Sequence, residues 1–447
     1  MSQSTSVRLN KELLNSIESP QDPTSISSSE NDNVDKRPSS EFTCFFVTFC
    51  SVGFVNAFGV FQEYYEQALL SNKSASDISW LGSVNIFCMF GCTSIAGILT
   101  DKYGPRFPLC FGSLVMVFAL MMMSLSTQYY QLFLTQAVLF GVGISFVILP
   151  AMATVSYYYA ASRSLAMGIT VAGSSLGGVI WPIALHRLLS EVKFGWTIRI
   201  AAFMMIPLLG LGCLMMDRPR EFANRPKPKA DFSIVKNPVI IFLSIGLFLV
   251  FLGLFSPLFY IPSYMVSLGK DANLAFYMVS IVNAASLFGR VLPGLLADKT
   301  GNYNVLFLVT VFSGLVACCW TKATSVGGIV VFSLAYGLAS GVSSPLNLEL
   351  PRFNWTFNSL TLMKAVISLQ SPCAAQIVPK EQFGLAMGAV MTFLSISGLI
   401  GTPISGQVLS PYGYLGLSLF SGLAMLLGSV FILIARLKIK TGLLVKV

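Results

Sequence analysis

Apolar runs recur along the whole chain with short polar breaks between them. A run of about 20 residues crosses the hydrocarbon core of a bilayer as a helix, whereas a water-soluble core does not produce such regular runs. The pattern therefore predicts a membrane protein with twelve spans. The predicted spans are 43–65, 78–100, 107–126, 131–155, 164–189, 195–216, 239–265, 274–297, 304–322, 326–345, 383–409 and 413–435.

The polar segment 217–238 divides the spans into two sets of six. It reads DRPREFANRPKPKADFSIVKNP, and its prolines and charges cannot lie in hydrocarbon. We therefore predict an all-α integral membrane protein, with twelve transmembrane helices in two pseudo-symmetric six-helix bundles. The predicted organisation is a disordered cytoplasmic tail over 1–40, a bundle over 41–217, a cytoplasmic loop over 218–238, a second bundle over 239–437 and a cytoplasmic tail over 438–447.

Lysine and arginine residues gather in the tails and in the breaks that follow the even-numbered spans. The breaks on the opposite side carry few. Because cytoplasmic loops of membrane proteins carry an excess of Lys and Arg, both termini are predicted to face the cytoplasm. The net charge of +9 reflects this topology, so we expect no nucleic-acid partner. We expect a multi-pass monomer in the lipid bilayer of the plasma membrane.

The composition excludes several classes of function. Hydrophobic residues make up 54% of the chain and charged residues 11%, against about 25% charged residues in soluble domains. His186 is the one histidine, and the nine cysteines lie in apolar stretches without metal-ligand companions, so we predict no metal site. No Gly-rich phosphate loop follows a strand pattern, which argues against an ATP-driven pump. We expect no cofactor and no enzymatic activity.

A motif repeats at the same place in each set of six spans. The segments 97–104 and 294–301 share the pattern G-x-L-x-D-K-x-G, each between the second and third span of its set. An Asp at a helix end can cap backbone donors or meet a neighbouring Arg, and a Gly lets two helices approach closely. The repeat indicates a duplicated transporter, in which charged clasps bias one conformation. The residues predicted to act in this conformational gating, rather than as ligands, are Gly97, Asp101, Lys102, Arg106, Gly294, Asp298 and Lys299.

A second repeat shows that the two halves differ in length. The sequence LAMG stands at 165–168 and again at 385–388. The first pair of motifs is 294 − 97 = 197 residues apart, whereas the LAMG pair is 385 − 165 = 220 residues apart. The extra residues lie in a polar segment of span ten, near 343–366. They are either an extended loop that the fold tolerates or an insertion foreign to it, such as an unspliced intron, which would leave an inactive carrier.

Two six-helix halves with this repeated motif resemble the major facilitator superfamily over roughly residues 41–437. Within that superfamily, the chain is similar to fungal members of the monocarboxylate porter (monocarboxylate transporter) family. The stretches that carry this second resemblance are GFVNAFGVFQEYY at 53–65, SWLGS at 79–83, GWTIR at 195–199 and GRVLPG at 289–294.

The resemblance implies a role for Arg290, because in that family an Arg of the eighth helix binds the anionic group of the substrate. Two family charges are missing here. Val60 stands at the position of a helix-one Lys, and Ser286 stands where an Asp precedes the Arg by one turn. A lactate-type proton path is therefore not implied. Fungal relatives of this kind include vitamin importers and exporters of secondary metabolites, so the resemblance does not name the cargo.

Polar side chains inside the spans are the candidates for substrate binding. Arg290 lies eight residues before Asp298, about 12 Å deeper at about 1.5 Å per residue, and an unpaired Arg at that depth is costly. We predict that Arg290 binds substrate in a cavity, the alternative being an ion pair that locks helices. Asn56 and Asn283 are predicted to bind substrate with it. For these two residues, and for Asn85, interhelical hydrogen bonds are the alternative.

Two further candidates lie near the predicted outer side. Glu63 is the candidate for proton coupling, because the carboxylates of Asp101, Asp217 and Asp298 sit at cytoplasmic ends. The alternative is an interfacial residue in contact with water, since two tyrosines follow it. Asn72 begins the sequence Asn-Lys-Ser and is a glycosylation candidate on a short outer loop.

Together these features predict a secondary active transporter of a small organic solute that works by alternating access. The cargo is expected to be a monocarboxylate-like organic anion or a secondary metabolite, with protons as a candidate coupling ion. A membrane sensor that binds a nutrient and signals through its tails is the alternative from another class.

Overall fold

The computed structural model describes residues 37–159, 162–216, 232–338, 365–378 and 382–439. All regular secondary structure in these residues is helical, as predicted. Of the two predicted tails, only residues 37–40 and 438–439 are described, and they belong to helices; of the predicted central loop, only residues 232–238 are described. The described part of the bundle extends from residue 40 as one unit.

The first half of the bundle, residues 40–216, supplies six spans from twelve helical segments. Several spans are divided by short breaks or by π-helical turns. The segments are α3 (Arg37–Cys50), α4 (Val52–Val55), α5 (Phe58–Tyr64), η1 (Tyr65–Leu69), α6 (Ala75–Gly91), α7 (Thr93–Tyr103), α8 (Arg106–Met123), α9 (Tyr129–Leu132), η2 (Phe133–Leu139), α10 (Phe140–Tyr158), α11 (Arg163–Glu191) and α12 (Phe194–Met215), of which α3 begins before residue 40.

The second half, residues 232–439, has the same order of long helices. Its last element, α19 (Phe383–Ile439), consists of two helices that meet at a kink, because Gly413 has a φ of +64°, and these two helices match the two spans predicted over 383–409 and 413–435. Glycine adopts this left-handed conformation without steric cost. The segments are η3 (Phe232–Lys236), α14 (Pro238–Ser267), α15 (Ala272–Thr300), α16 (Asn302–Cys319), η4 (Trp320–Lys322), α17 (Val326–Leu338), α18 (Ala365–Ala375) and α19 (Phe383–Ile439).

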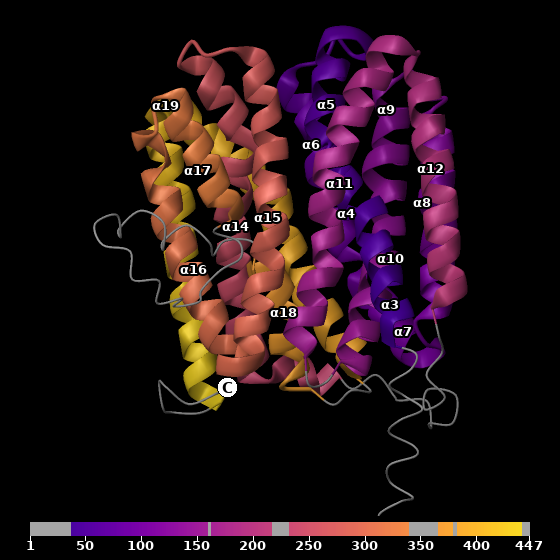
Figure 1. The fold of residues 1–447 in the computed structure, drawn as a ribbon, viewed down its shortest axis with the longest axis vertical. Coiled ribbons are helices and arrows are strands. Elements are labelled where there is room, and N and C mark those ends of the chain that lie inside the picture. Colours follow the sequence, from indigo (N-terminus) through magenta and orange to yellow (C-terminus); the bar gives the residue numbers. More distant parts are fainter. Residues whose placement is uncertain (1–36, 160–161, 217–231, 339–364, 379–381, 440–447) are drawn as a thin grey trace, which may run out of the picture. The chain divides into compact units, whose positions relative to one another are not determined.

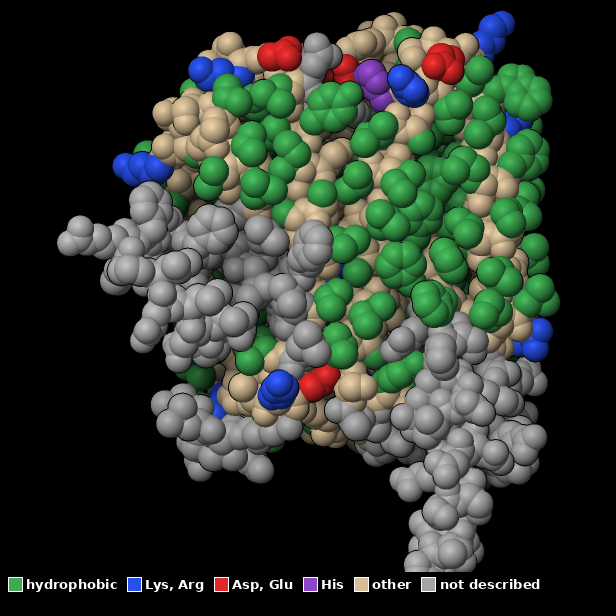
Figure 2. Space-filling view, viewed as in Figure 1, with side chains coloured by type: hydrophobic (Ala, Val, Ile, Leu, Met, Phe, Trp, Pro, Cys, Tyr) green, Lys and Arg blue, Asp and Glu red, His purple; other side chains and the backbone are tan. Residues whose placement is uncertain are grey.

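Within the described residues, nine helices are long and apolar enough to cross a membrane. α19 counts once among them but contains two spans, and α15 and the pair α17 and α18 complete the predicted set of twelve. On the face shown in Figure 2, hydrophobic side chains cover the middle of the bundle, and most charged side chains lie toward its two ends. This distribution is the one that a lipid bilayer requires.

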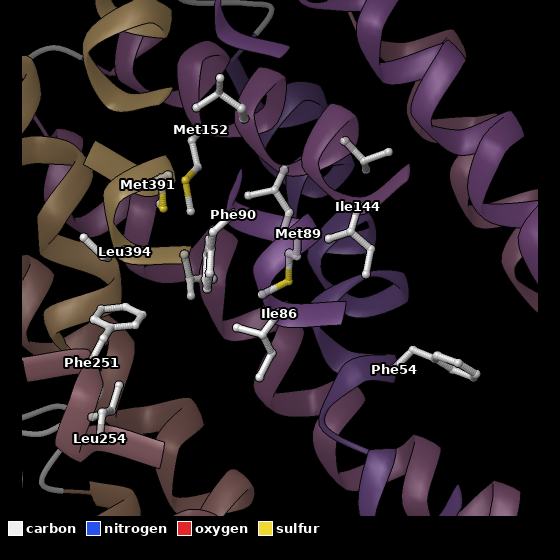
Figure 3. Close-up of a cluster of buried hydrophobic side chains, with 14 of the residues drawn as sticks. Phe54, Ile86, Met89, Phe90, Ile144, Met152, Phe251, Leu254, Met391 and Leu394 are labelled. Atoms are coloured by element: carbon white, nitrogen blue, oxygen red, sulfur yellow. The ribbon is translucent and has the colours of Figure 1, made fainter. Parts of the chain in front are cut away.

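The two halves lie side by side in Figure 1 and meet along two seams. In one seam α11 packs along α15, and in the other α6 and α7 pack along α19. Apolar side chains fill the space between them: Phe90 of α6 faces side chains of α14 and α19 (Figure 3), and Ile86 of α6 packs against Gly398 of α19. The rings of Phe90 and Phe251 meet edge to face, with centroids 6.0 Å apart.

The tenth span differs from its prediction. A single helix was expected over 326–345, whereas the structure has α17, which ends at Leu338, and α18, which begins at Ala365. Both pack against α15. Their 13 and 11 residues together are about 36 Å long at about 1.5 Å per residue, which is the length of one span. The predicted insertion near 343–366 lies outside the described residues, apart from the first two residues of α18.

Candidate functional site

The repeated aspartates lie at the same end of the bundle, which we call the motif end. It is the end at which α7 and α15 finish and α11 and α19 begin, at the lower edge of Figure 1. The opposite end, where α5 leads into η1, is called the far end. Both motif aspartates contact the other half of the molecule.

Asp101, near the end of α7, caps the first turn of α19. Its Oδ1 accepts a hydrogen bond from the backbone N–H of Gly384 at 3.0 Å, and its Oδ2 accepts one from that of Leu385 at 2.9 Å. The first N–H groups of a helix have no partner inside the helix and carry the positive end of its dipole. One carboxylate therefore satisfies two of these donors and supplies the matching charge.

Asp298, at the corresponding place in α15, caps the first turn of α11 in the same way. Its Oδ1 and Oδ2 accept hydrogen bonds from the backbone N–H groups of Ser164 and Leu165, at 3.0 and 3.1 Å. Leu165 and Leu385 are the first residues of the two LAMG repeats. The two repeated motifs found in the sequence thus bind each other crosswise, and each pair joins the two halves.

Glycines allow the backbones to approach beneath these caps. A Cβ added to Gly97 would lie 2.1 Å from the carbonyl oxygen of Gly384, and one added to Gly168 would lie 2.3 Å from that of Arg290. Real Cβ atoms do not come so close to backbone atoms, so a larger residue at either position would push the halves apart. For Gly97 this is the close approach that the motif predicted. Gly294 lies within α15 near Asp298.

Unlike the two aspartates, the basic residues of the motifs are exposed to the surroundings. Lys102, Arg106 and Lys299 are exposed at the motif end, and the Lys102 ammonium lies 5.2 Å from the ring centre of its neighbour Tyr103. Arg163, which the sequence did not single out, lies closer to the caps. It donates from Nε to the carbonyl oxygen of Ser156 and lines a small cavity together with Asp101.

Arg290 is buried in the seam between α15 and α11. Its Nη1 donates to the carbonyl oxygen of Val171 and to the hydroxyl of Ser174, both on α11, and only 3% of the residue is exposed. Its Nε has no hydrogen-bond partner in the described residues. Arg290 was predicted to bind substrate in a cavity or to form an ion pair. In this structure it is buried, and the two groups to which Nη1 donates are both uncharged. It links the two halves through neutral groups of α11.

The two predicted asparagines converge on the same stretch of α11. Asn56 lies in the break between α4 and α5, and its Nδ2 donates to the carbonyl oxygen of Ser174 at 3.2 Å. Asn283 of α15 packs against Gly178, where an added Cβ would lie 2.7 Å from its side-chain carbon. The structure therefore brings Arg290, Asn56 and Asn283 into contact with one segment of α11, residues 171–178.

Ser286 occupies the position of the missing family aspartate and belongs to the same seam. Its hydroxyl and that of Ser175 are 2.6 Å apart, and both residues are fully buried. A neutral serine pair takes the place that a charge would have held. The sequence showed that the charge was missing, but not that a partner serine on α11 replaced it.

Glu63 and Asn72 both lie toward the far end, away from the seams. Glu63 is exposed and accepts a hydrogen bond from Gln67, one helical turn later, at 3.2 Å. Its location agrees with the interfacial alternative, and its role in proton coupling stays a prediction. Asn72 is exposed in the turn between η1 and α6, which is an accessible position for a glycan.

The chemistry of the seams is that of binding and movement. Within the described residues, no group of three or more His, Cys, Asp and Glu side chains could hold a metal ion. The polar groups described above for the two seams are hydroxyls, amides, backbone groups, the capping carboxylates of Asp101 and Asp298, and the guanidinium of Arg290. Such hydrogen bonds can break and re-form without covalent change, so the halves can separate along the seams.

Known proteins match this chain in both sequence and fold. The profile described as Major Facilitator Superfamily matches residues 44–353. The chain is 73% identical over 455 aligned residues to the agnestins efflux protein of Paecilomyces divaricatus, with 100% of each chain covered. It is 37% identical over 391 residues to the aspyridones efflux protein of Emericella nidulans, covering 86% of this chain and 74% of that one. A solved structure of the proton:xylose symporter XylE shares the fold, with a TM-score of 0.68 at 12% identity over 90% of this chain and 96% of that one.

Proposed function

Because the chain belongs to the Major Facilitator Superfamily, we propose that it exports a small organic secondary metabolite by alternating access between its two halves. It is a multi-pass membrane transporter and not an enzyme. The names of two relatives favour export as the direction, since one is an agnestins efflux protein and the other an aspyridones efflux protein. We further propose that both termini face the cytoplasm and that the host membrane is the plasma membrane.

The observation that carries this proposal is the crossed pair of aspartate caps. Asp101 and Asp298 each hold the first turn of a helix in the other half, and the two caps are equivalent under the internal repeat. Both lie at the motif end, so the halves are clasped there. Breaking both caps would let the motif end open while the far end closes, which is the movement that alternating access requires.

Arg290 is proposed to meet the cargo once the α11–α15 seam loosens. Its partners in the closed seam are a carbonyl and a hydroxyl, which stabilise a buried guanidinium less than an anion would. A cargo with an anionic group would therefore compete for Arg290 with Val171 and Ser174. Protons remain the proposed coupling ion.

Metabolite profiling of a deletion strain tests the function. We expect at least one organic compound to accumulate inside the cells and to fall in the medium, because its exit route is gone. The same compound should then exchange across proteoliposomes that contain the purified full-length protein. Identical profiles in both strains would contradict export. An accumulated compound that does not exchange through the purified protein would contradict it too. A sensor would change the profiles without exchanging the compound.

A further inference from the structure

A small aromatic cavity lies between the first half of the bundle and α14 of the second half, away from the caps. Five phenylalanine rings line it, and we call this lining the aromatic box: Phe54, Phe58, Phe61, Phe140 and Phe259. The Phe54 ring centre lies 5.4 Å from that of Phe61 and 5.3 Å from that of Phe140. These separations are typical of aromatic rings that attract one another, and an aromatic guest would be held in the same way.

One polar group of the box is unsatisfied. Asn85 of α6 is 4% exposed and lines the cavity, and its Oδ1 has no hydrogen-bond partner in the described residues. Its Nδ2 donates to the carbonyl oxygen of Gln136 at 2.7 Å, which fixes the orientation of the amide. A buried carbonyl oxygen without a donor costs about 1–3 kcal/mol, so the site gains most from a guest that supplies a hydrogen.

The second amide of the box is already held. Gln136 Oε1 accepts a hydrogen bond from the buried hydroxyl of Tyr65 at 2.8 Å. Tyr65 begins the π-helical segment η1, and Gln136 lies in the other one, η2, so this bond joins the two irregular segments of the first half. π-Helical turns are uncommon and often mark functional sites. The hydrogen bond fixes the position of Gln136 and leaves Asn85 Oδ1 as the acceptor.

We propose that the aromatic box is a recognition subsite for a planar aromatic cargo that carries a hydroxyl group, with Asn85 Oδ1 accepting the hydrogen bond of that hydroxyl. The inference rests on the proposed transport function and names its substrate class. The amide oxygen favours a neutral donor and repels an anion, and the box's lining residues are aromatic, aliphatic, glycine or amide. The hydroxylated aromatic part of a metabolite therefore fits here.

The closed conformation leaves room for water but not for such a guest. The free space in the box is about 30 Å³, enough for one or two water molecules. Among its lining residues, Phe259 of α14 belongs to the second half, and the others belong to the first. Separation of the halves would therefore remove Phe259 and open the box while its other walls stay together. Gly82 leaves space for the Phe58 ring, which would lie 2.7 Å from an added Cβ.

A matched pair of ligands tests the subsite on the purified full-length protein in nanodiscs. 2-Naphthol and 2-methoxynaphthalene have the same planar ring system, but only the first can donate to Asn85. We expect 2-naphthol to displace radiolabelled 2-naphthol about fivefold better or more, because one unsatisfied buried acceptor is worth about 1 kcal/mol or more. Asn85→Leu should reduce this preference to within about twofold. Ser280→Ala, which removes another buried unpartnered oxygen, should retain it.

A labelling measurement covers the case in which Asn85→Leu does not fold. Val55 lines the box, so in the Cys319→Ser background 2-naphthol should protect a Val55→Cys variant from a maleimide more strongly than 2-methoxynaphthalene does. Equal binding and equal protection by the two ligands would overturn the proposal, as would an unchanged preference in Asn85→Leu. These are binding measurements. If 2-naphthol is preferred in an Asn85-dependent way but no compound exchanges in proteoliposomes, transport is contradicted and the subsite stands. If a compound exchanges but no such preference is found, the subsite is contradicted and transport stands.

Discussion

For Arg290, the sequence predicted a functional residue but not the side chains and backbone groups that it contacts. Its depth in a span marked it as functional, since a lone guanidinium in a membrane needs a partner. The structure gives it Val171 and Ser174 on α11, in the opposite half. No spacing in the sequence relates residue 290 to residues 171–174, because helices far apart along the chain meet only through the packing of the two halves.

Replacing Arg290 with Gln should reduce transport at least tenfold with normal expression. A hydrogen bond to a charged group contributes about 1.5–3 kcal/mol, and the amide also removes the charge offered to the cargo. Initial rates of cargo exchange in proteoliposomes measure the effect. Arg187→Gln is the matched control, because Arg187 is exposed near the end of α11. Exchange kinetics like those of the unaltered protein in Arg290→Gln would refute a role for this residue in transport.

At the scale of helices, the two caps make the first turns of α11 and α19 the clasps of the molecule. Asp101→Asn combined with Asp298→Asn should shift the equilibrium toward states open at the motif end, by about tenfold per cap. Each substitution removes one charge and one acceptor oxygen from a pair of charge-assisted bonds. Spin labels at Tyr103→Cys and Thr300→Cys, both exposed at the motif end, report the separation between the halves by double electron–electron resonance.

The label experiment needs a background in which the exposed Cys319 is replaced by Ser. Asp77→Asn is the control for charge loss, since Asp77 forms a capping box with Ser74 within the first half at the far end. A longer distance between the labels in the double variant alone is expected. An unchanged distance distribution would show that the caps do not hold the halves together.

The structure of the tenth span bears on whether the segment near 343–366 is part of the mature protein. α17 and α18 lie against the same helix and together have the length of one span, and the family match ends at residue 353, inside the predicted insertion. We therefore expect the mature transcript to lack codons near 343–366, which would join two helices into one. Sequencing the messenger RNA decides this. A mature message that contains these codons would show that the segment belongs to the protein, as an extended loop.

At the scale of the whole molecule, the orientation in the membrane can be tested from both ends. Lys73 is exposed at the far end and Lys299 at the motif end. In intact cells and in the Cys319→Ser background, we expect a membrane-impermeant maleimide to label Lys73→Cys and not Lys299→Cys, because the Lys and Arg distribution places the motif end in the cytoplasm. Permeabilised cells provide the control, in which both variants should react. Labelling of Lys299→Cys alone in intact cells would reverse the proposed topology.

Much of this protein followed from its sequence. Apolar runs of span length fixed the class, the polar segment 217–238 divided the halves, and the repeated motifs identified the aspartates and glycines, because these features depend on residue type and spacing along one chain. Only the tertiary structure decided that Asp101 reaches Gly384, that Asp298 reaches Ser164, and that Asn85 is left with a free acceptor beside five aromatic rings. These contacts depend on which faces of two helices meet across the bundle. Membrane-spanning helices are apolar on all sides, so their hydrophobic pattern does not show which face packs against which neighbour.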